Sequence, residues 1–239
     1  MFRSLHIMPV PGLGEVRPGN DLAGMIMTAC AESEETSLEA GDVLVVSQKV
    51  VSKAENRLVA VDPDDPQSHK PLVEAESARI VRRRGDLIIS ETHHGFVCAT
   101  AGIDRSNVEP GTAALLPVDP DRSARRLRDA IKGRLNLAVA IIVADTFGRP
   151  WRRGLTDVAI GSAGIKPILD LRGTDDALGR ELSVTEVCIV DELAGAAELV
   201  RGKADGIAVA IVRGVDPGWF GEGGVVADVV RHPNEDLFR

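Results

Sequence analysis

The chain has 239 residues, enough for one large domain or two small ones that bury a sizeable core. Apolar residues make up 44% of it, but aromatic residues make up only 3% and Tyr is absent, so the core must be built from Val, Ile, Leu and Ala. The net charge of −8 and the pI near 5.2 argue against a general nucleic-acid-binding protein, and no apolar run reaches the roughly 18 residues of a membrane span.

Cysteine usage points to a reducing compartment. Cys30, Cys98 and Cys188 are odd in number, far apart in the chain and without CxxC spacing. This pattern fits reduced thiols better than disulfides or a zinc site. Because no charged-then-apolar leader opens the chain, we expect a cytoplasmic protein.

The first third of the chain contains two predicted strands with a helix between them. The strands are expected at 5–10 and 41–46, and the helix at 22–32. Lys49 and Lys53 come directly after the second strand, at the end where α/β proteins commonly hold ligands. They are therefore candidates for contacts with phosphate, and the alternative is a pair of solvated surface lysines.

The middle of the chain leads to a loop of unusual composition. A helix is predicted at 71–83, with a basic last turn suited to a helix C-terminus, and a strand is predicted at 86–90. The following stretch, 91–107, concentrates histidines, glycines and small polar residues where a structural loop needs only a turn. Asp104 offers a hard anionic oxygen there, a mixture that suits a polyphosphate held through a divalent cation. The alternative is a turn-rich loop in which Asp104 caps a helix.

A second acidic position follows a strongly apolar run. Asp145 and Thr146 stand at the tip of the predicted strand 137–144, a common way to present a metal-binding pair. Because Asp104 also follows an apolar segment, we expect both carboxylates to converge on one edge of the same sheet. The remaining predicted elements are strands at 114–118, 182–190 and 207–212 and helices at 123–135 and 191–200.

Further charged residues lie in the second half of the chain. Arg149, Arg152 and Arg153 can bind carboxylate or phosphate bidentately, the alternative being surface arginines beside an Asx-turn. Glu222 lies between glycines and is either an exposed turn residue or a third carboxylate ligand. No GxxxxGK[ST] and no GxGxxG after a strand is present, which excludes a P-loop and a Rossmann fingerprint.

Several segments, in the same order along the chain, resemble the signature of the coenzyme F-420-0:gamma-glutamyl ligase family. The matching segments are 50–53, 94–107, 145–149 with Trp151-Arg152, 202–206 and the tail 236–239. One departure is Thr100, where many relatives carry Asn. The resemblance implies an α+β fold of mixed sheets and helices, assembled as an intertwined homodimer. We expect residues 1–239 to form a single ligase unit, as one body or two intimately packed α+β subdomains, without the C-terminal nitroreductase-like domain that some relatives carry.

The resemblance also implies an activity, the GTP-dependent addition of L-glutamate to the deazaflavin coenzyme F-420-0 in γ-linked tails. A carboxylate and an amine do not condense in water, so the γ-phosphoryl of GTP would first form an acyl phosphate that the amine attacks. Two divalent ions, Mg²⁺ or Mn²⁺, would offset the repulsion between the anionic partners, and K⁺ is a further expected cofactor. The alternatives are another acid–amine ligase acting on a flavin- or pterin-like acid, and a non-catalytic nucleotide- or metal-binding regulatory protein.

The resemblance assigns roles to individual residues. Asp104 and Asp145 match ligands of one metal ion, and Thr146 matches a ligand of a second ion together with Glu222. Beyond the resemblance, the chemistry makes Arg149 and Arg152 the expected catalytic cations, which would orient the acidic substrates or steady the transferred phosphoryl. The expected base for the amine is His94 or its neighbour His93, and the alternative is an oxygen of the product. The positions that match nucleotide contacts are Leu13, Gly14, Glu15, Val16, Ser47, Gln48, Lys53 and Asn107, with Phe220, Gly221, Gly223 and Gly224 in a second, glycine-rich loop at 220–227.

Overall fold

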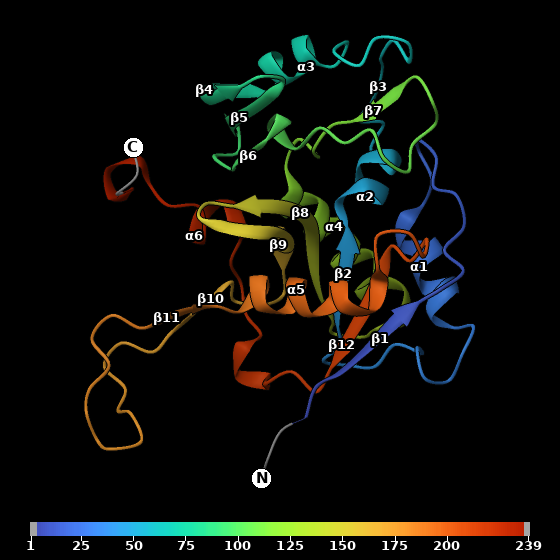
Figure 1. Ribbon diagram of the computed structural model, residues 1–239. Helices are drawn as coiled ribbons and strands as arrows, with labels where there is room; N and C mark the ends of the chain where they lie inside the picture. Colours follow the sequence, from blue (N-terminus) through green and yellow to red (C-terminus); the bar gives the residue numbers. More distant parts are fainter. Residues whose placement is uncertain (1–3, 237–239) are drawn as a thin grey trace.

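A five-stranded mixed sheet forms the centre of the computed structural model, which describes residues 4–236 (Figure 1). The β2–β8 pair is parallel, and the other neighbouring pairs of this sheet are antiparallel. As expected from composition, its buried strands are built from Val, Ile, Leu and Ala. In spatial order the strands are β1 (His6–Val10), β12 (Val209–Arg213), β2 (Val43–Ser47), β8 (Ala140–Arg149) and β9 (Arg152–Ala163).

Helices cover both faces of this sheet. Helix α5 (Ile189–Arg201) crosses the front in Figure 1, while α4 (Pro120–Leu135) lies behind, next to α1 (Leu22–Cys30). The start of α4 packs so closely on β9 that a Cβ at Gly161 would stand 2.4 Å from the Pro120 backbone. Only glycine fits this approach, which fixes α4 against the sheet.

A second group of elements lies above the central sheet in Figure 1 and has its own small hydrophobic cluster, formed by seven buried residues that include Val73, Ile88 and Leu115. Helix α2 (Gln48–Ala54) leads from β2 into this group. Its other elements are the pair β3 (Leu58–Ala60) and β7 (Thr112–Ala114), helix α3 (Lys70–Ala75), and the sheet of β4 (Ser77–Arg84), β5 (Leu87–Thr92) and β6 (Val97–Ala99).

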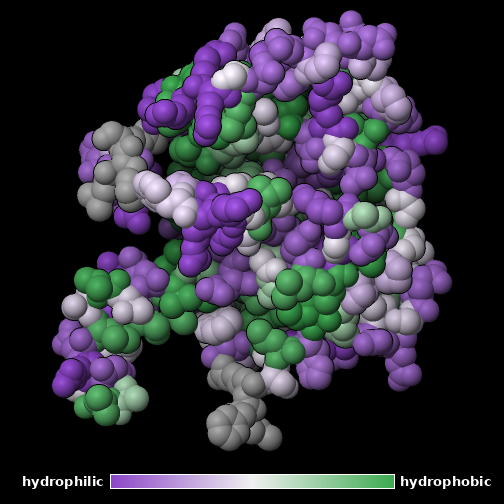
Figure 2. Space-filling view, viewed as in Figure 1, coloured by the Kyte–Doolittle hydropathy of each residue, from purple (hydrophilic) through white to green (hydrophobic). Residues whose placement is uncertain are grey.

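A two-stranded arm extends away from the body. It consists of β10 (Ile168–Asp170) and β11 (Glu186–Cys188) and the loop between them. Figure 2 shows hydrophobic residues along this arm, and the side chains of Leu178 and Val184 are almost fully exposed. The remaining short elements are α6 (Val225–Asp228) and three 3₁₀ turns, at Thr100–Gly102, Pro217–Trp219 and Pro233–Glu235.

The predicted α+β class is confirmed, but the predicted helix at 71–83 is wrong beyond Ala75. The chain turns there into β4, which pairs antiparallel with β5 through a tight turn at Gly85. Cross-strand pairing outweighs the helical spacing of the apolar residues, and the β-branched Ile80 and Val81 favour it. The basic residues at 79–84 therefore line a strand and do not complement a helix C-terminus.

Two other predicted strands are shorter than expected. The segment 114–118 is a strand only as far as Ala114, because side chains of α2, and not another strand, take the carbonyl of Leu115. The segment 182–190 is a strand only at Glu186–Cys188, and α5 begins at Ile189. Among residues 4–236, no helix combines the length and apolar composition needed to cross a bilayer. The tail motif lies outside the described residues apart from Asp236.

Candidate functional site

A cavity of about 620 Å³ opens where β2, β8 and the end of α5 meet the upper group of elements. It gathers residues from six separate stretches of the chain. The lining residues used below are Leu13, Gly14, Glu15, Val16, Ser47, Gln48, Lys49, Lys53, Asp104, Asn107, Asp145, Thr146, Asp157, Glu198, Arg201 and Lys203. All predicted nucleotide contacts outside the glycine-rich loop, and three of the four predicted metal ligands, thus lie around one space.

The first wall of the cavity is the loop after β1. Leu13 and Val16 are buried in the core and anchor this loop, so the backbone of Gly14 and Glu15 is held at the rim. Gly14 has φ +72°, a left-handed conformation that favours glycine. Glu15 accepts a hydrogen bond of 2.6 Å from Lys53 Nζ, which closes the wall toward α2.

Helix α2 forms the second wall and begins directly where β2 ends. Gln48 and Ser52 both donate to the Leu115 carbonyl, so the inner face of the helix is fixed to the upper group. Lys49 Nζ lies 2.8 Å from Asp104 Oδ2 and donates to Ser106 Oγ at 2.9 Å. Two ammonium groups, of Lys49 and Lys53, therefore stand on the cavity side of one short helix.

Asp104 and Asp145 reach the cavity from different sheets, which corrects the expectation of one shared sheet edge. Asp104 follows the 3₁₀ turn at Thr100–Gly102 and forms an isolated bridge with Ala114, beside β7. Asp145 lies inside β8, which continues to Arg149, and does not stand at the strand's tip. The two carboxylates meet because the upper group of elements covers this part of β8.

The two carboxylates have opposite pKa shifts. The pKa of Asp145 is raised to about 7, mainly by burial and also by the neighbouring charges of Asp104 and Asp157, against a lowering hydrogen bond from the Thr146 amide. Burial also raises the pKa of Asp104, but hydrogen bonds from Lys49 and Ser106 outweigh it, so the net shift is downward. The cavity thus holds one stabilised carboxylate and one whose ionisation is costly without a nearby cation.

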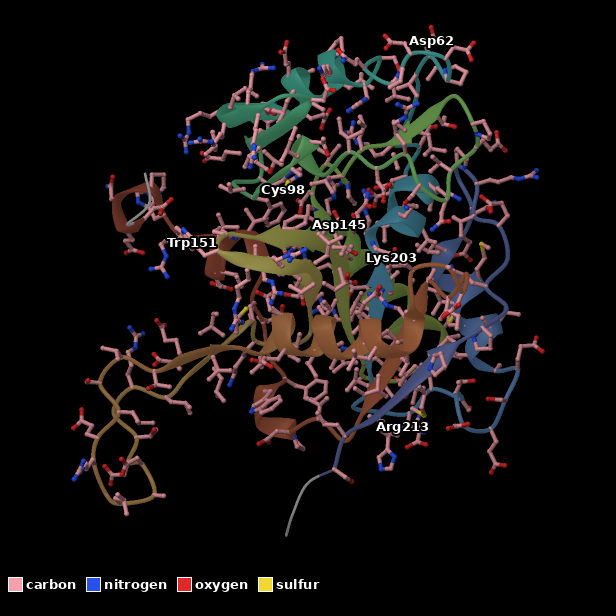
Figure 3. All side chains as sticks on the ribbon, in the orientation of Figure 1. Asp62, Cys98, Asp145, Trp151, Lys203 and Arg213 are labelled. Carbon is pink, nitrogen blue, oxygen red and sulfur yellow. The ribbon has the colours of Figure 1, made fainter. Side chains whose placement is uncertain are left out.

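A buried polar chain on the α5 side was missed by the sequence reasoning. Thr146 Oγ1 donates to Asp157 Oδ1 at 2.6 Å, and Lys203 Nζ donates to Thr146 Oγ1 at 2.5 Å. Arg201 contacts the other oxygen of Asp157 and also pairs with Glu198 at 3.2 Å. Burial, and then the charge of Asp157, raise the pKa of Glu198. Figure 3 shows Asp145 and Lys203 close together in the middle of the molecule.

A signal for this chain was present in the sequence. Arg201 is separated from Ala197, Ala194 and Val190 by four, seven and eleven residues, so it sits on the buried face of α5. A charged residue at core spacing needs a buried partner, here Asp157. Lys203 lies in the segment 202–206, whose resemblance to the family was noted without assigning a role.

The predicted catalytic arginines lie elsewhere. Arg149, Arg152 and Arg153 are exposed at the tip of the β8–β9 hairpin, whose turn contains Trp151 at φ +58°. Figure 3 shows Trp151 at this tip, well separated from Asp145 in that view. In a single chain these arginines do not line the cavity.

His94 and the glycine-rich loop also lie outside the cavity and share a different groove, of about 700 Å³. His94 Nε2 must donate to the Pro117 carbonyl, at 2.9 Å, since a carbonyl only accepts, and its ring stacks on Phe96. Neither His94 nor His93, whose Nε2 lies 3.0 Å from the Ala75 carbonyl, faces the cavity. His94 therefore has a structural role in the observed arrangement.

The glycine-rich loop at 220–227 is held by a carboxylate of the protein itself. Asp121 accepts hydrogen bonds from the amides of Val225 and Val226, at 2.8 and 3.1 Å. A Cβ at Gly224 would stand 2.8 Å from Asp121 Oδ2. This close approach accounts for the glycine, and no bound nucleotide is needed to explain it. Glu222 is 84% exposed and lies 3.3 Å from Arg128, so one chain does not bring it to Asp145. Phe220, Gly221 and Gly223 also lie outside the cavity lining.

Comparisons with known proteins give a consistent result. A sequence model of the F420-0:Gamma-glutamyl ligase family matches residues 12–214. The Coenzyme F420:L-glutamate ligase of Methanopyrus kandleri is 44% identical, over 99% of this chain and 98% of the relative. The protein of the same name from Methanothermobacter thermautotrophicus is 40% identical over 98% and 99%, and that of Archaeoglobus fulgidus is 37% identical over 98% and 96%. The chain therefore belongs to the F420-0:gamma-glutamyl ligase family.

Proposed function

We propose that the protein is a GTP-dependent ligase that adds L-glutamate to coenzyme F420-0 through γ-linked amides, by way of an acyl phosphate. The observation that carries the proposal is the convergence of six segments on one cavity lined by carboxylates and by four cationic side chains, Lys49, Lys53, Arg201 and Lys203. The names of the relatives, Coenzyme F420:L-glutamate ligase, support the ligation of L-glutamate to the coenzyme.

The cationic wall suits a nucleoside triphosphate. Lys49 and Lys53 stand on α2 at the carboxyl end of β2, and the exposed Gly14 lines the same cavity. Ammonium groups act as point charges toward phosphate oxygens and lower the cost of bringing a polyanion into an acidic protein. We expect GTP to be used in preference to ATP. Equal turnover with both nucleotides at matched concentrations would contradict that preference.

The donor atoms fit a divalent cation that is shared with a substrate. Among the described residues, no three His, Cys, Asp or Glu side chains are grouped closely enough to hold a metal ion by themselves. Mg²⁺ is usually held by one or two carboxylates and completed by water and phosphate oxygens, which is what Asp104 and Asp145 offer. When bound, such an ion neutralises phosphate charge and polarises the phosphoryl group. Asp104 and Asp145 would hold one such ion and the Thr146 hydroxyl would hold a second, and the high pKa of Asp145 would fall in the presence of the first.

The chain's own residues would supply binding, orientation and charge. The lysines would hold the triphosphate with its γ-phosphoryl toward the substrate carboxylate, so that phosphoryl transfer gives the acyl phosphate and GDP. The glutamate amine would then attack the acyl carbon, form the amide and release phosphate. Holding these partners in one cavity converts encounters in solution into oriented steps within one complex.

We also propose that two chains form an intertwined homodimer, with the second copy supplying the elements that one chain keeps away from the cavity. The supporting observations are the exposed arm with Leu178 and Val184, and the predicted residues Arg149, Arg152 and Glu222 at exposed positions. Mixed dimers of Asp145→Asn and Glu222→Gln chains should be more active than either parent dimer. A chain that stays monomeric in light scattering while fully active would contradict the dimer.

The direct test is incubation with GTP, Mn²⁺, L-glutamate and coenzyme F420-0, followed by mass spectrometry of the deazaflavin product. Glutamylated product that requires all four components is expected. GTP binding without product would favour the regulatory-protein alternative, and turnover only with another flavin- or pterin-like acid would favour a different acid–amine ligase.

A further inference from the structure

The Thr146 hydroxyl has a defined orientation, because one of its two hydrogen-bond partners can only accept and the other can only donate. A carboxylate only accepts hydrogen bonds, so Thr146 must donate its proton to Asp157 Oδ1, at 2.6 Å. An ammonium only donates, so the hydroxyl oxygen must accept from Lys203 Nζ, at 2.5 Å. One donor and one lone pair are therefore used, and one lone pair remains.

Asp157 is itself held in place by the sheet and by Arg201. It lies opposite Thr146 in the β8–β9 pairing, so the sheet register holds the two side chains together. Its second oxygen accepts a hydrogen bond from Nη2 of Arg201, the last residue of α5. Both side chains are buried, since Asp157 is only 4% exposed and Arg201 only 2%. Arg201 Nε and Nη1 have no hydrogen-bond partner among the described residues, so Asp157 and Glu198 are the partners that compensate this buried charge.

We propose that Asp157 is a positioning residue, which turns the free lone pair of the Thr146 hydroxyl toward a cation bound to the nucleotide, and that Arg201 acts through Asp157. This inference rests on the proposed function, since it assigns a partner to the cation site proposed there. Asp157 has the role that hydrogen-bonded carboxylates have behind metal ligands in other proteins, where such partners orient the ligand and tune its affinity.

The replacement Asp157→Asn tests this role, because it keeps the shape but offers one oxygen and one NH₂ group. Arg201 can only donate hydrogen bonds, so it should bind the side-chain amide oxygen that the Asp157→Asn replacement introduces. The NH₂ group of this amide then faces Thr146. The hydroxyl oxygen then accepts from both this amide and Lys203, and no lone pair remains for a cation. Cation affinity should fall although no predicted metal ligand has been changed.

The measurement is the binding of Mn²⁺ in the presence of GDP, followed by electron paramagnetic resonance of free Mn²⁺, so that no turnover is needed. Asp157→Asn should weaken Mn²⁺ binding by roughly 10–100-fold, the range found for such outer partners, and Thr146→Val should weaken it by at least as much, while Thr146→Ser stays close to the wild type. The double variant Thr146→Val/Asp157→Asn should be no weaker than the weaker-binding single variant, because both changes remove the same contact.

A rescue variant separates positioning from a general structural effect. In Asp157→Asn/Arg201→Gln, no buried guanidinium demands the amide oxygen, so the amide can turn and accept from Thr146 again. This variant should recover most of the Mn²⁺ affinity. If Asp157→Asn alone does not fold, Asp157→Ala/Arg201→Gln is the comparison, because it also removes both buried charges but offers no acceptor.

The matched control is Asp42→Asn, which disrupts another Asp–Arg pair whose carboxylate is buried. Asp42 accepts from Arg213 Nε and Nη2, both at 2.8 Å, at the end of β12 away from the cavity (Figure 3). It should lower the melting temperature without changing Mn²⁺ affinity. The inference alone would be overturned if Asp157→Asn folds and binds Mn²⁺ as tightly as the wild type. It would also be overturned if the losses of Mn²⁺ affinity in Asp157→Asn and Thr146→Val multiply in the double variant. A wild-type protein that binds no Mn²⁺ with GDP would instead overturn the proposed function, and this inference with it.

Discussion

The cavity and the groove contain similar residue types but use them differently. In the groove, Asp121 is occupied by backbone amides and His94 by a backbone carbonyl, so the polar atoms hold the chain's own loops in place. In the cavity, Lys49 and Lys203 contact the side chains of Asp104 and Thr146 directly. A ligand can replace side-chain contacts without unfolding a loop. Both oxygens of Asp121 accept from backbone amides, whereas Asp104 and Asp145 each give one oxygen to a backbone amide. This difference distinguishes the structural region from the candidate site better than composition does.

The largest expected effect is on catalysis by Asp145→Asn, which removes a charge from the cavity and keeps its shape. Activity should fall by at least the roughly 10–100-fold seen when outer partners of metal ligands are lost, and excess Mn²⁺ should recover only part of it. Steady-state assays across a Mn²⁺ titration measure this. A variant with normal activity at low Mn²⁺ would mean that the cation lies elsewhere.

The same variant should change how stability depends on pH in the metal-free protein. The pKa of Asp145 is about 7 in the folded state and 3.8 unfolded, so its ionisation penalises the fold. The free energy of unfolding should therefore decrease as pH rises from about 4 to 7, by up to about 4 kcal/mol at about 1.4 kcal/mol per pKa unit. Asp145→Asn should lack this decrease and be at least as stable as wild type at pH 8. Urea unfolding at several pH values checks it, and equal slopes for both proteins would contradict it.

In the groove the corresponding change, Asp121→Asn, should affect stability and not binding. The replacement loses a charged acceptor for buried amides of Ser162 and Val225, so the free energy of unfolding should fall by about 1–3 kcal/mol. Nucleotide affinity, measured by calorimetry with GDP and Mn²⁺, should stay unchanged in the folded variant. A large loss of affinity with normal stability would remove the distinction between the two regions.

The smallest expected effect is that of Lys53→Ala, since its ion pair with the exposed Glu15 contributes only about 0–1 kcal/mol to stability. The KM for GTP should rise several-fold with a melting curve close to that of the wild type, because one point charge near the phosphates is lost. The matched control is Lys166→Ala, a lysine that donates to the Gly218 carbonyl and does not line the cavity. Unchanged KM for GTP in Lys53→Ala would make Lys53 a surface lysine.

Local signals in the sequence were sufficient for part of this structure. Apolar runs located β2, β8 and β12, and the residue types placed after them located Lys49, Lys53 and Asp145. The helix at 71–83 was wrong because pairing of β4 with β5 depends on a partner strand that periodicity does not contain. Asp157 was not identified because its importance arises from hairpin register, which sets it opposite Thr146. The glycines at 220–227 were assigned to nucleotide binding, whereas the close approach of Asp121 already requires a glycine at position 224. Asp121 also binds the amide of Val225, which is 104 residues away, so the sequence alone does not show this contact.

Hydrogen exchange of backbone amides, with and without GDP and Mn²⁺, tests the central claim most directly, because it reports on both regions in one experiment. The account predicts ligand-dependent protection in three cavity segments, 13–16, 47–54 and 202–208, which the fold brings together from distant parts of the chain. Protection confined to the glycine-rich loop at 220–227, with these three segments unchanged, would contradict the assignment of the cavity as the nucleotide site.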